Sequence, residues 1–156
     1  MTSYPTDAPQ APADTPEEVL SRAQAMVQLT PQAHALGIAV TAIENGRVHG
    51  RVPYRQDLVG DPDTGVIAGG VLTTLLDQIA GTAAVVAMKE PTAVATIDLR
   101  IDYMRPAEPG RDIIAEAHCI KLTRSVAFVR AVAFEDSAEN PVAHAAAAFM
   151  ITGARK

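Results

Sequence analysis

The chain has 156 residues, of which 48% are hydrophobic and 20% charged, and its net charge is −5 at pH 7. This length is typical of one domain, and the composition excludes a disordered or fibrous protein. Thirteen Lys plus Arg against 18 Asp plus Glu leave no basic footprint for a nucleic-acid partner. The single cysteine, Cys119, cannot form an internal disulfide, which fits a reducing compartment. The first ten residues also lack the features of a secretion signal, so we expect a cytoplasmic protein.

We expect residues 1–15 to form a flexible N-terminal tail and residues 16–156 to form a single domain. The tail is rich in proline and shows no periodic apolar pattern. The Thr-Pro-Glu-Glu segment at 15–18 then offers a capping threonine, a proline at the first helical position and a glutamate three residues after the cap. Apolar residues follow at helical spacing, which predicts a short amphipathic helix that ends near Leu29.

The apolar period changes at Ile38, where the pattern becomes that of a β-hairpin. Residues 38–43 and 47–53 flank Asn45-Gly46, and this dipeptide supplies the two positive φ angles of a type I′ turn. Residues 54–67 are mostly polar and are expected to form a loop. The hairpin is therefore followed by a long connection before the next element.

Residues 69–88 form the longest apolar run of the chain, and their length would nearly cross a bilayer. Asp77 lies near the middle of this run, where an acidic side chain costs about 2.5–3.5 kcal/mol on membrane-insertion scales. Much of the run is also Ala, Thr and Gly. We therefore predict a buried helix in a protein core, with no membrane partner.

The second half of the chain predicts antiparallel sheet. Apolar and polar residues alternate strictly over residues 96–103, which predicts a strand with one wet and one dry face. Further strands are expected over 111–122, 124–135 and 142–152. The order is helix, two strands, long buried helix and four strands, which indicates an α+β fold whose sheet wraps one apolar helix.

Asp77 is the candidate with the most chemical information. A carboxylate on so apolar a helix is costly unless another group satisfies it. Two interpretations remain open from periodicity alone: a structural aspartate bonded to a backbone amide or to an arginine of the sheet, and a catalytic acid or base. No local cation can pair with it, because its neighbours at helical spacing are Thr73, Thr74, Ala80 and Gly81.

Gly69 and Gly70 open the same helix. Paired glycines allow close approach of a ligand, and free amides at a helix start favour a developing negative charge. Asp77 follows Gly69 by eight residues, so a ligand that extends along the helix could meet both. The alternative is that the glycines serve only as a hinge and as packing.

Other site patterns fail. The glycine spacing at 60–65 lacks the lysine and hydroxyl residue of a phosphate loop, and the aspartates of the same loop lack the terminal glutamate of an EF-hand. The four histidines show no metal-ligand spacing, and no nucleophile elbow is present. We therefore expect no metal.

Two motifs together resemble a known family. The pattern G-x-x-A-G-G-V-L-x-x-L-L-D-x-x-x-G-x-A-A is followed by T-I-D-L-R-I-D-Y-M-R-P-A-x-x-G and later by L-T-R-S-V-A-F. This combination resembles the hotdog-fold acyl-CoA thioesterases, and most closely the PaaI-like, phenylacetate-pathway branch that includes thioesterase-superfamily member 2 proteins. The resemblance covers about residues 36–152.

The resemblance implies a hotdog fold, in which a curved antiparallel sheet wraps a long central helix. It also implies a homodimer or a dimer of dimers with active sites at the subunit interface. By position, Asp77 would be the general base or nucleophile, the Gly69 amide would bind the thioester carbonyl, and Thr96 would orient water from the other subunit. The CoA moiety belongs to the substrate, so no cofactor is expected. The residues expected to bind substrate are Gly70, Asp61, Arg105, Arg124 and Ser125, with the two arginines toward the CoA phosphates.

The chain departs from the family motif at Ala68, where the family has a histidine. Asp61 is the best counterpart of the family's preceding asparagine, with one extra residue before Gly65. We favour an acyl-CoA thioesterase, because a backbone donor does not depend on the side chain at 68. Two alternatives remain: a non-catalytic acyl-CoA-binding protein and a hydratase or dehydratase of the same fold. The acyl group is not specified, since Leu72, Leu76 and Ile79 suggest an apolar pocket of either aromatic or medium-chain preference.

Overall fold

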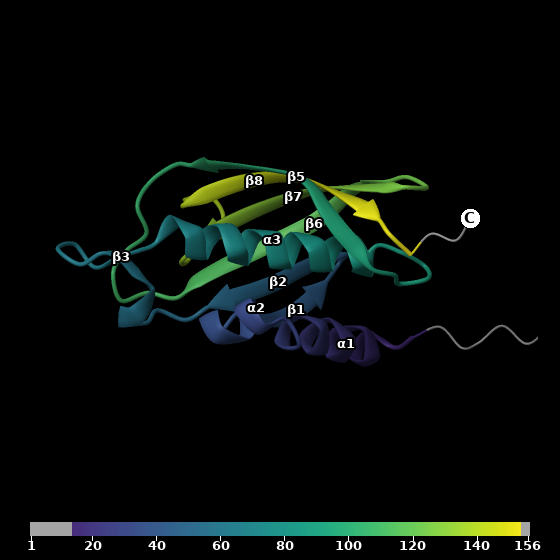
Figure 1. The fold of residues 1–156 in the computed structure, drawn as a ribbon, viewed down its shortest axis with the longest axis horizontal. Coiled ribbons are helices and arrows are strands. Elements are labelled where there is room, and N and C mark those ends of the chain that lie inside the picture. Colours follow the sequence, from purple (N-terminus) through teal and green to yellow (C-terminus); the bar gives the residue numbers. More distant parts are fainter. Residues whose placement is uncertain (1–13, 154–156) are drawn as a thin grey trace, which may run out of the picture.

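The computed structural model describes residues 14–153. One six-stranded antiparallel sheet has the strand order β1-β2-β6-β7-β8-β5 and curls around helix α3 (Figure 1). The predicted α+β class and the wrapped central helix are both confirmed. The helices are α1 (Pro16–Gln28), α2 (Pro31–Leu36) and α3 (Gly69–Val86), and the strands are β1 (Ala39–Glu44), β2 (Arg47–Val52), β3 (Val59–Asp61), β4 (Val66–Ile67), β5 (Val94–Tyr103), β6 (Ile113–Leu122), β7 (Val126–Phe134) and β8 (Ala143–Ile151).

The first helix begins as its capping residues predict. The Thr15 hydroxyl accepts from the Glu18 amide at 3.3 Å, and the Glu18 carboxylate accepts from the Thr15 amide at 2.8 Å. Of the predicted N-terminal tail, residues 1–13 lie outside the described residues, and Asp14 pairs with Arg22 of α1 at 2.5 Å. A second helix, α2, follows directly and was not predicted. It is short because Gly37 ends it in the left-handed conformation, at φ 76°.

The predicted hairpin is confirmed as β1 and β2. Asn45 and Gly46 have φ angles of 51° and 74°, as a type I′ turn requires. The connection over 54–67 is more ordered than expected, since it contains a short 3₁₀ turn, Gln56–Leu58, and the small β3–β4 hairpin. This hairpin leads directly into α3.

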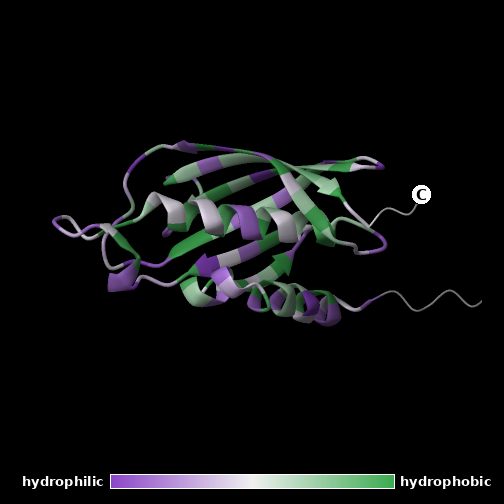
Figure 2. Ribbon diagram, in the orientation of Figure 1, coloured by the Kyte–Doolittle hydropathy of each residue, from purple (hydrophilic) through white to green (hydrophobic). Residues whose placement is uncertain are grey.

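Helix α3 forms the centre of the core. Nine of its residues are buried, and the helix contacts β2, β5, β6, β7 and β8. By length and composition α3 could cross a membrane, but half of that stretch is buried against the sheet, as expected of a core helix. Figure 2 shows a polar band near the middle of the otherwise apolar or neutral helix, where Asp77 and Gln78 lie.

The two edges of the sheet differ. Beside β1, side chains of α1 reach the sheet: Gln28 donates to the Ile38 carbonyl at 3.0 Å and Gln24 to the Val40 carbonyl at 3.3 Å. Strand β5 forms the other edge, and no further strand pairs with it in the described chain. The predicted dry face of this strand is only partly covered, since Leu99 and Ile101 are half-buried and Ile97 is 52% exposed. An open ten-residue edge invites pairing with another chain.

Candidate active site

Asp77 meets a single partner, and that partner is neither of the two expected for a structural aspartate. The Thr96 hydroxyl on β5 donates to Asp77 Oδ1 at 2.8 Å. No group among the described residues donates to the second carboxylate oxygen, Oδ2. The carboxylate is therefore held in orientation by one oxygen and keeps the other for an external proton donor, such as a water.

Thr96 reaches Asp77 because of a β-bulge. Ile97 is an extra residue in β5, since Thr96 pairs with Phe149 while the next paired residue, Asp98, lies opposite Ala148. Phe149 is buried, so Thr96 lies on the inner face of the sheet. Strict alternation would have placed Thr96 on the wet face with Asp98. A bulge that turns one side chain toward a site is a recurrent feature of sheets.

The structure also places Thr96 and Asp77 on the same chain. The resemblance had implied that Thr96 acts from the other subunit, whereas the 2.8 Å hydrogen bond joins it to Asp77 of its own chain. The pair lies in a hollow of about 240 Å³ between α3, β5 and the end of α1. Gln78, Gly81 and Phe149 also line this hollow.

The start of α3 presents free amides to open space. Within residues 14–153 the Gly69 and Gly70 amides have no acceptor, whereas the Val71 amide donates to the Ala68 carbonyl at 3.0 Å. The N-cap residue Ala68 makes no side-chain cap. Neither Gly69 nor Gly70 has a positive φ. A Cβ on Gly70 would meet nothing within 4 Å, and one on Gly69 would only touch Tyr103 at 3.4 Å. The chain's own packing therefore does not require these glycines, which indicates that they leave room for something outside it.

Tyr103 holds the first turn of α3 from the end of β5. Its hydroxyl donates to the Gly69 carbonyl at 2.8 Å and lies 2.9 Å from the Thr73 hydroxyl. We did not single out Tyr103 from the sequence, although it lies within the motif that carries the resemblance. The contact between Tyr103 and Gly69 could not be predicted from local pattern, because 34 residues separate them in the sequence.

The β3–β4 hairpin anchors the same helix start from the other side. The Ala68 amide donates to the Leu58 carbonyl at 2.9 Å. A Cβ on Gly60 would lie 2.7 Å from the Ala68 Cα, so only glycine permits this close approach. The orientation of the Gly69 and Gly70 amides thus depends on backbone packing, with Ala68 contributing no side-chain hydrogen bond.

Gly69 and Asp77 lie too far apart on one chain to serve one carbonyl group. Eight residues of helix rise by about 12 Å, whereas an oxyanion donor and a base must both lie within about 3 Å of the reacting group. A ligand could extend along one chain past both residues. The two groups could meet at a single thioester only if they came from two copies of the chain.

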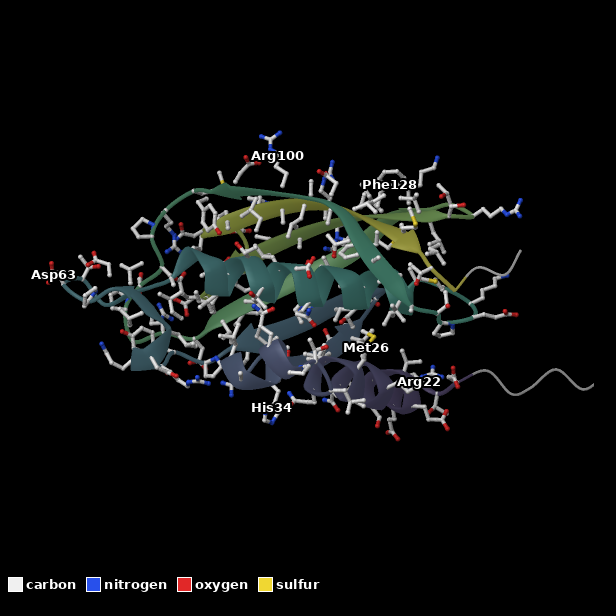
Figure 3. All side chains as sticks on the ribbon, in the orientation of Figure 1. Arg22, Met26, His34, Asp63, Arg100 and Phe128 are labelled. Atoms are coloured by element: carbon white, nitrogen blue, oxygen red, sulfur yellow. The ribbon has the colours of Figure 1, made fainter. Side chains whose placement is uncertain are left out.

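The Asp61 carboxylate is hydrogen-bonded within its own loop. Its carboxylate accepts from the Thr64 hydroxyl at 2.6 Å and from the Asp63 amide at 3.1 Å. The Thr64 hydroxyl, followed by the Asp63 amide, lowers the pKa of the Asp61 carboxyl. Asp63 marks the tip of this loop, at the far end of the molecule (Figure 3). The contacts of Asp61 shape the β3–β4 turn.

Arg105 is also engaged inside the chain. Its guanidinium donates to the Glu135 carboxylate at 2.5 and 3.1 Å and to the Asn140 carbonyl at 2.8 Å. The Glu135 side chain is only 3% exposed. Burial by itself would raise the pKa of Glu135, but the hydrogen bonds from Arg105 and the Glu108 amide outweigh burial and lower it. A CoA phosphate would have to compete with Glu135 for Arg105.

Arg124 and Ser125 lie in the exposed turn between β6 and β7. This turn is at the end of the molecule away from the start of α3 (Figure 1). The Ser125 carbonyl accepts from the Ile151 amide at 2.8 Å. Arg124 forms no ion pair within residues 14–153 and lines a hollow of about 460 Å³ with Glu90 and Thr92. Of the two arginines proposed for phosphate, Arg124 is the one that is free to bind it.

Within residues 14–153, no three His, Cys, Asp or Glu side chains lie together as metal ligands would. The lone cysteine, Cys119, is free and half-buried on β6. Burial raises the pKa of its thiol. A thiol with a raised pKa is a poor nucleophile near neutral pH, so Asp77 remains the reactive group best placed for catalysis.

Comparison with known proteins finds similar sequences. A family model described as the thioesterase superfamily matches residues 64–141, a range that includes Gly69, Asp77 and Thr96. A protein of Halobacterium salinarum, whose name classes it as a candidate esterase, is 35% identical over 75% of this chain and 82% of its own length. Human acyl-coenzyme A thioesterase 13 is 36% identical over 64 residues, which are 41% of this chain and 45% of that protein.

Solved structures agree with these relatives. A protein from Pseudomonas aeruginosa has a TM-score of 0.78 and 38% identity, over 85% of this chain and 98% of that one. The Escherichia coli PaaI protein of the phenylacetic acid degradation operon has a TM-score of 0.76 at 19% identity, over 89% of this chain and 96% of that one. At this identity PaaI supports the fold alone.

Proposed function

Since this chain belongs to the thioesterase superfamily and is a thioester hydrolase, we propose that its substrates are acyl-CoA thioesters and that Asp77 is the catalytic carboxylate. The observation that carries this proposal is the Asp77 carboxylate itself, held at Oδ1 by Thr96 at 2.8 Å and with no donor to Oδ2 in the part of the chain that the structure describes. Acyl-coenzyme A thioesterase 13, 36% identical in the aligned segment, supports the substrate class.

The carboxylate acts on the attacking water, and the helix start acts on the thioester carbonyl. Asp77 Oδ2 accepts a proton from a water, the resulting hydroxide attacks the thioester carbonyl carbon, and the oxygen of that carbonyl gains negative charge. The amide of Gly69, with Gly70 beside it, donates to this oxyanion at the positive end of the α3 dipole. The C–S bond then breaks, CoA leaves as thiolate and takes a proton, and the free acid remains. Direct attack by the carboxylate, followed by hydrolysis of the anhydride, would use the same groups.

The complete site requires two copies of the chain. The donor and the base lie about 12 Å apart along α3, so Gly69 of one copy serves Asp77 of its partner. The open edge of β5 offers the surface for pairing, and Thr96 lies on this strand beside Asp77. Exposed apolar side chains on the sheet face away from α3, among them Phe128 and Met150, offer a second contact for a dimer of dimers (Figure 3).

The remaining residues bind or position substrate. Gly70 leaves the space through which the thioester approaches. Arg124 and Ser125 bind the CoA phosphates from the exposed β6–β7 turn of a neighbouring copy, since on the same copy they lie beside the groove that leads away from Asp77 past Met88 and Thr92. Asp61 and Arg105 act by holding the loops that they bond. These roles need neither a metal nor a cofactor beyond the CoA of the substrate, and we propose that the enzyme acts in the cytoplasm.

Thiol release from a panel of acyl-CoAs tests the proposal, with wild type and Asp77→Asn measured side by side. We expect turnover by wild type and a loss of at least about 100-fold in kcat for Asp77→Asn, because the amide cannot accept the proton of water. Glu139→Gln removes one acidic group from an exposed turn and serves as the control, with activity unchanged.

Two outcomes would overturn this assignment. Hydrolysis by Asp77→Asn at the rate of wild type would remove Asp77 from the mechanism. No turnover by wild type on any acyl-CoA, with saturable binding retained, would favour a non-catalytic acyl-CoA-binding protein, in which Ala68 in place of the family's histidine marks the lost chemistry.

A further inference from the structure

The hollow at Asp77 does not end at the catalytic pair. It continues into a groove of about 540 Å³ between α1, the end of α3 and the segment 88–93. Four residues line both spaces and mark their junction: Met26, Thr82, Val85 and Ala93. Figure 3 shows Met26 on the side of α1 that faces α3.

The groove walls are apolar and adaptable. Val19, Met26 and Leu29 of the α1 segment face Val85, Val86 and Met88 at the end of α3. Among residues 14–153, no aromatic side chain lines this groove. Unbranched methionines fill and release irregular apolar space more easily than branched or aromatic residues do. Such walls suit a flexible aliphatic chain better than a flat ring.

Two of the polar groups of the groove are already engaged within the chain. The Thr82 hydroxyl donates to the Gln78 carbonyl at 2.8 Å, and the Arg22 guanidinium pairs with Asp14 at 2.5 Å. The pantetheine arm of CoA carries two amides, which would find few partners in this mostly apolar lining, where Lys89 and Thr92 are the remaining polar side chains, and would lose hydrogen bonds on entering. The acyl end of the substrate, and not its CoA end, therefore fits this space.

We infer that the groove between α1 and α3 binds the acyl chain of the substrate and selects unbranched aliphatic chains of medium length. The inference rests on the proposed function, because it places the thioester at Asp77. From Asp77 to Val86 the helix rises by about 13 Å, which gives the chain a path along two and a half turns. Leu72, Leu76 and Ile79, which had suggested an acyl pocket, are instead buried in the core.

Ala93 offers the variant that tests this path. It is exposed, it lies at the junction of the two spaces, and its methyl group can be enlarged without entering the core. We expect Ala93→Phe to lower kcat/KM for octanoyl- and decanoyl-CoA by at least about 10-fold. Each methylene that can no longer be buried against the apolar walls weakens binding by up to about fourfold. Acetyl-CoA turnover should stay within about twofold of wild type. Ala35→Phe, on exposed α2, is the matched control and should change neither substrate.

Wild type should also prefer decanoyl-CoA to both acetyl-CoA and phenylacetyl-CoA in kcat/KM. Equal loss of acetyl and decanoyl turnover in Ala93→Phe, or no loss, would overturn the acyl groove while leaving the hydrolase intact. A change in oligomeric state on light scattering of Ala93→Phe would assign the groove to contact between copies and would also overturn it.

Decanoate binding, measured by calorimetry, is independent of turnover. We expect decanoate to bind wild type and Ala35→Phe and to bind Ala93→Phe at least about 10-fold more weakly. Equal binding to all three, or no binding to wild type, overturns the inference. Absence of acyl-CoA turnover by wild type would instead overturn the proposed hydrolysis, and the decanoate result would still decide the groove.

Discussion

At the scale of single residues, the site depends on one hydrogen bond. The Thr96 hydroxyl donates to Asp77 Oδ1 at 2.8 Å and so fixes which oxygen of the carboxylate faces open space. A freely rotating carboxylate would present the required geometry for only part of the time. Thr96 is therefore a positioning residue for Asp77.

Thr96→Val should separate this positioning role from substrate binding. Valine keeps the shape and β-branching of threonine but cannot donate, so we expect kcat to fall about 10- to 100-fold with KM nearly unchanged. Thr96→Ser restores the donor and should recover most of kcat. Steady-state kinetics on one acyl-CoA decides the matter, and a variant that changes KM alone would contradict the role.

At the scale of elements, α3 fits against the sheet through one close approach. A Cβ at Gly50 on β2 would lie 2.2 Å from Ile79 Cδ1 and 3.0 Å from the Ala39 carbonyl oxygen. Ile79 is fully buried. The glycine thus sets the distance at which the central helix, and Asp77 with it, packs on the sheet.

Gly50→Ala should lower the free energy of unfolding by about 1–3 kcal/mol, the usual cost of an added methyl in a packed core. Gly81→Ala is the matched control. Its Cβ would make only an ordinary contact with Phe149 at 3.4 Å, and alanine favours helix over glycine by up to about 1 kcal/mol. Denaturant unfolding of both variants measures the two effects, which should have opposite signs. Equal stability of Gly50→Ala and wild type would mean that α3 lies farther from β2.

The Arg105–Glu135 pair links the segment after β5 to the end of β7. Glu135→Gln leaves Arg105 without its carboxylate partner, so we expect a loss of about 2–4 kcal/mol in unfolding free energy at neutral pH. Glu108→Gln, which removes an exposed partner of Arg111, should cost less than about 1 kcal/mol.

The pH dependence of this loss follows from the pKa of Glu135. The folded pKa is lowered from an ordinary value of 4.5, so the pair contributes fully above pH 4.5 and its contribution disappears as pH falls through the lowered value. The difference in unfolding free energy between wild type and Glu135→Gln should therefore become smaller only at acidic pH. Thermal melts from pH 7 to pH 3 measure it, and a gap that stays constant over this range would contradict the role of the pair.

Much of this fold could be predicted because its signals are local. Asn45-Gly46 specifies its own turn, and the long apolar run specifies a central helix. The bulge at Ile97 could not be predicted, because an extra residue in an alternating strand changes the pairing and not the composition. The partner of Arg105 was missed for a similar reason, since Glu135 lies 30 residues away and only the fold brings them together. Asp77 stood out because a carboxylate on an apolar helix is unusual in any context.

At the scale of the whole molecule, the proposed mechanism gives one chain the parts of two half-sites. In this proposal each copy offers a donor at Gly69 and a base at Asp77, about 12 Å apart on the same helix. Strand β5 leaves an edge open beside Asp77, whereas α1 side chains cover part of the edge at β1. A symmetric dimer through β5 would bring each donor toward the partner's base and would create two equivalent sites.

Mixed dimers test this arrangement directly. Asp77→Asn removes the base, and Gly70→Phe fills the open space at the helix start without an internal clash, so each variant alone should be inactive yet folded. In a dimer that contains one chain of each kind, one of the two sites combines the intact base with the intact helix start. Random pairing makes half of the dimers mixed, so the refolded mixture should regain about a quarter of wild-type activity. Light scattering must first show that both variants assemble as wild type does. If correctly assembled mixtures regain no activity, the donor and the base belong to the same chain, and the thioester must be bound along a single α3.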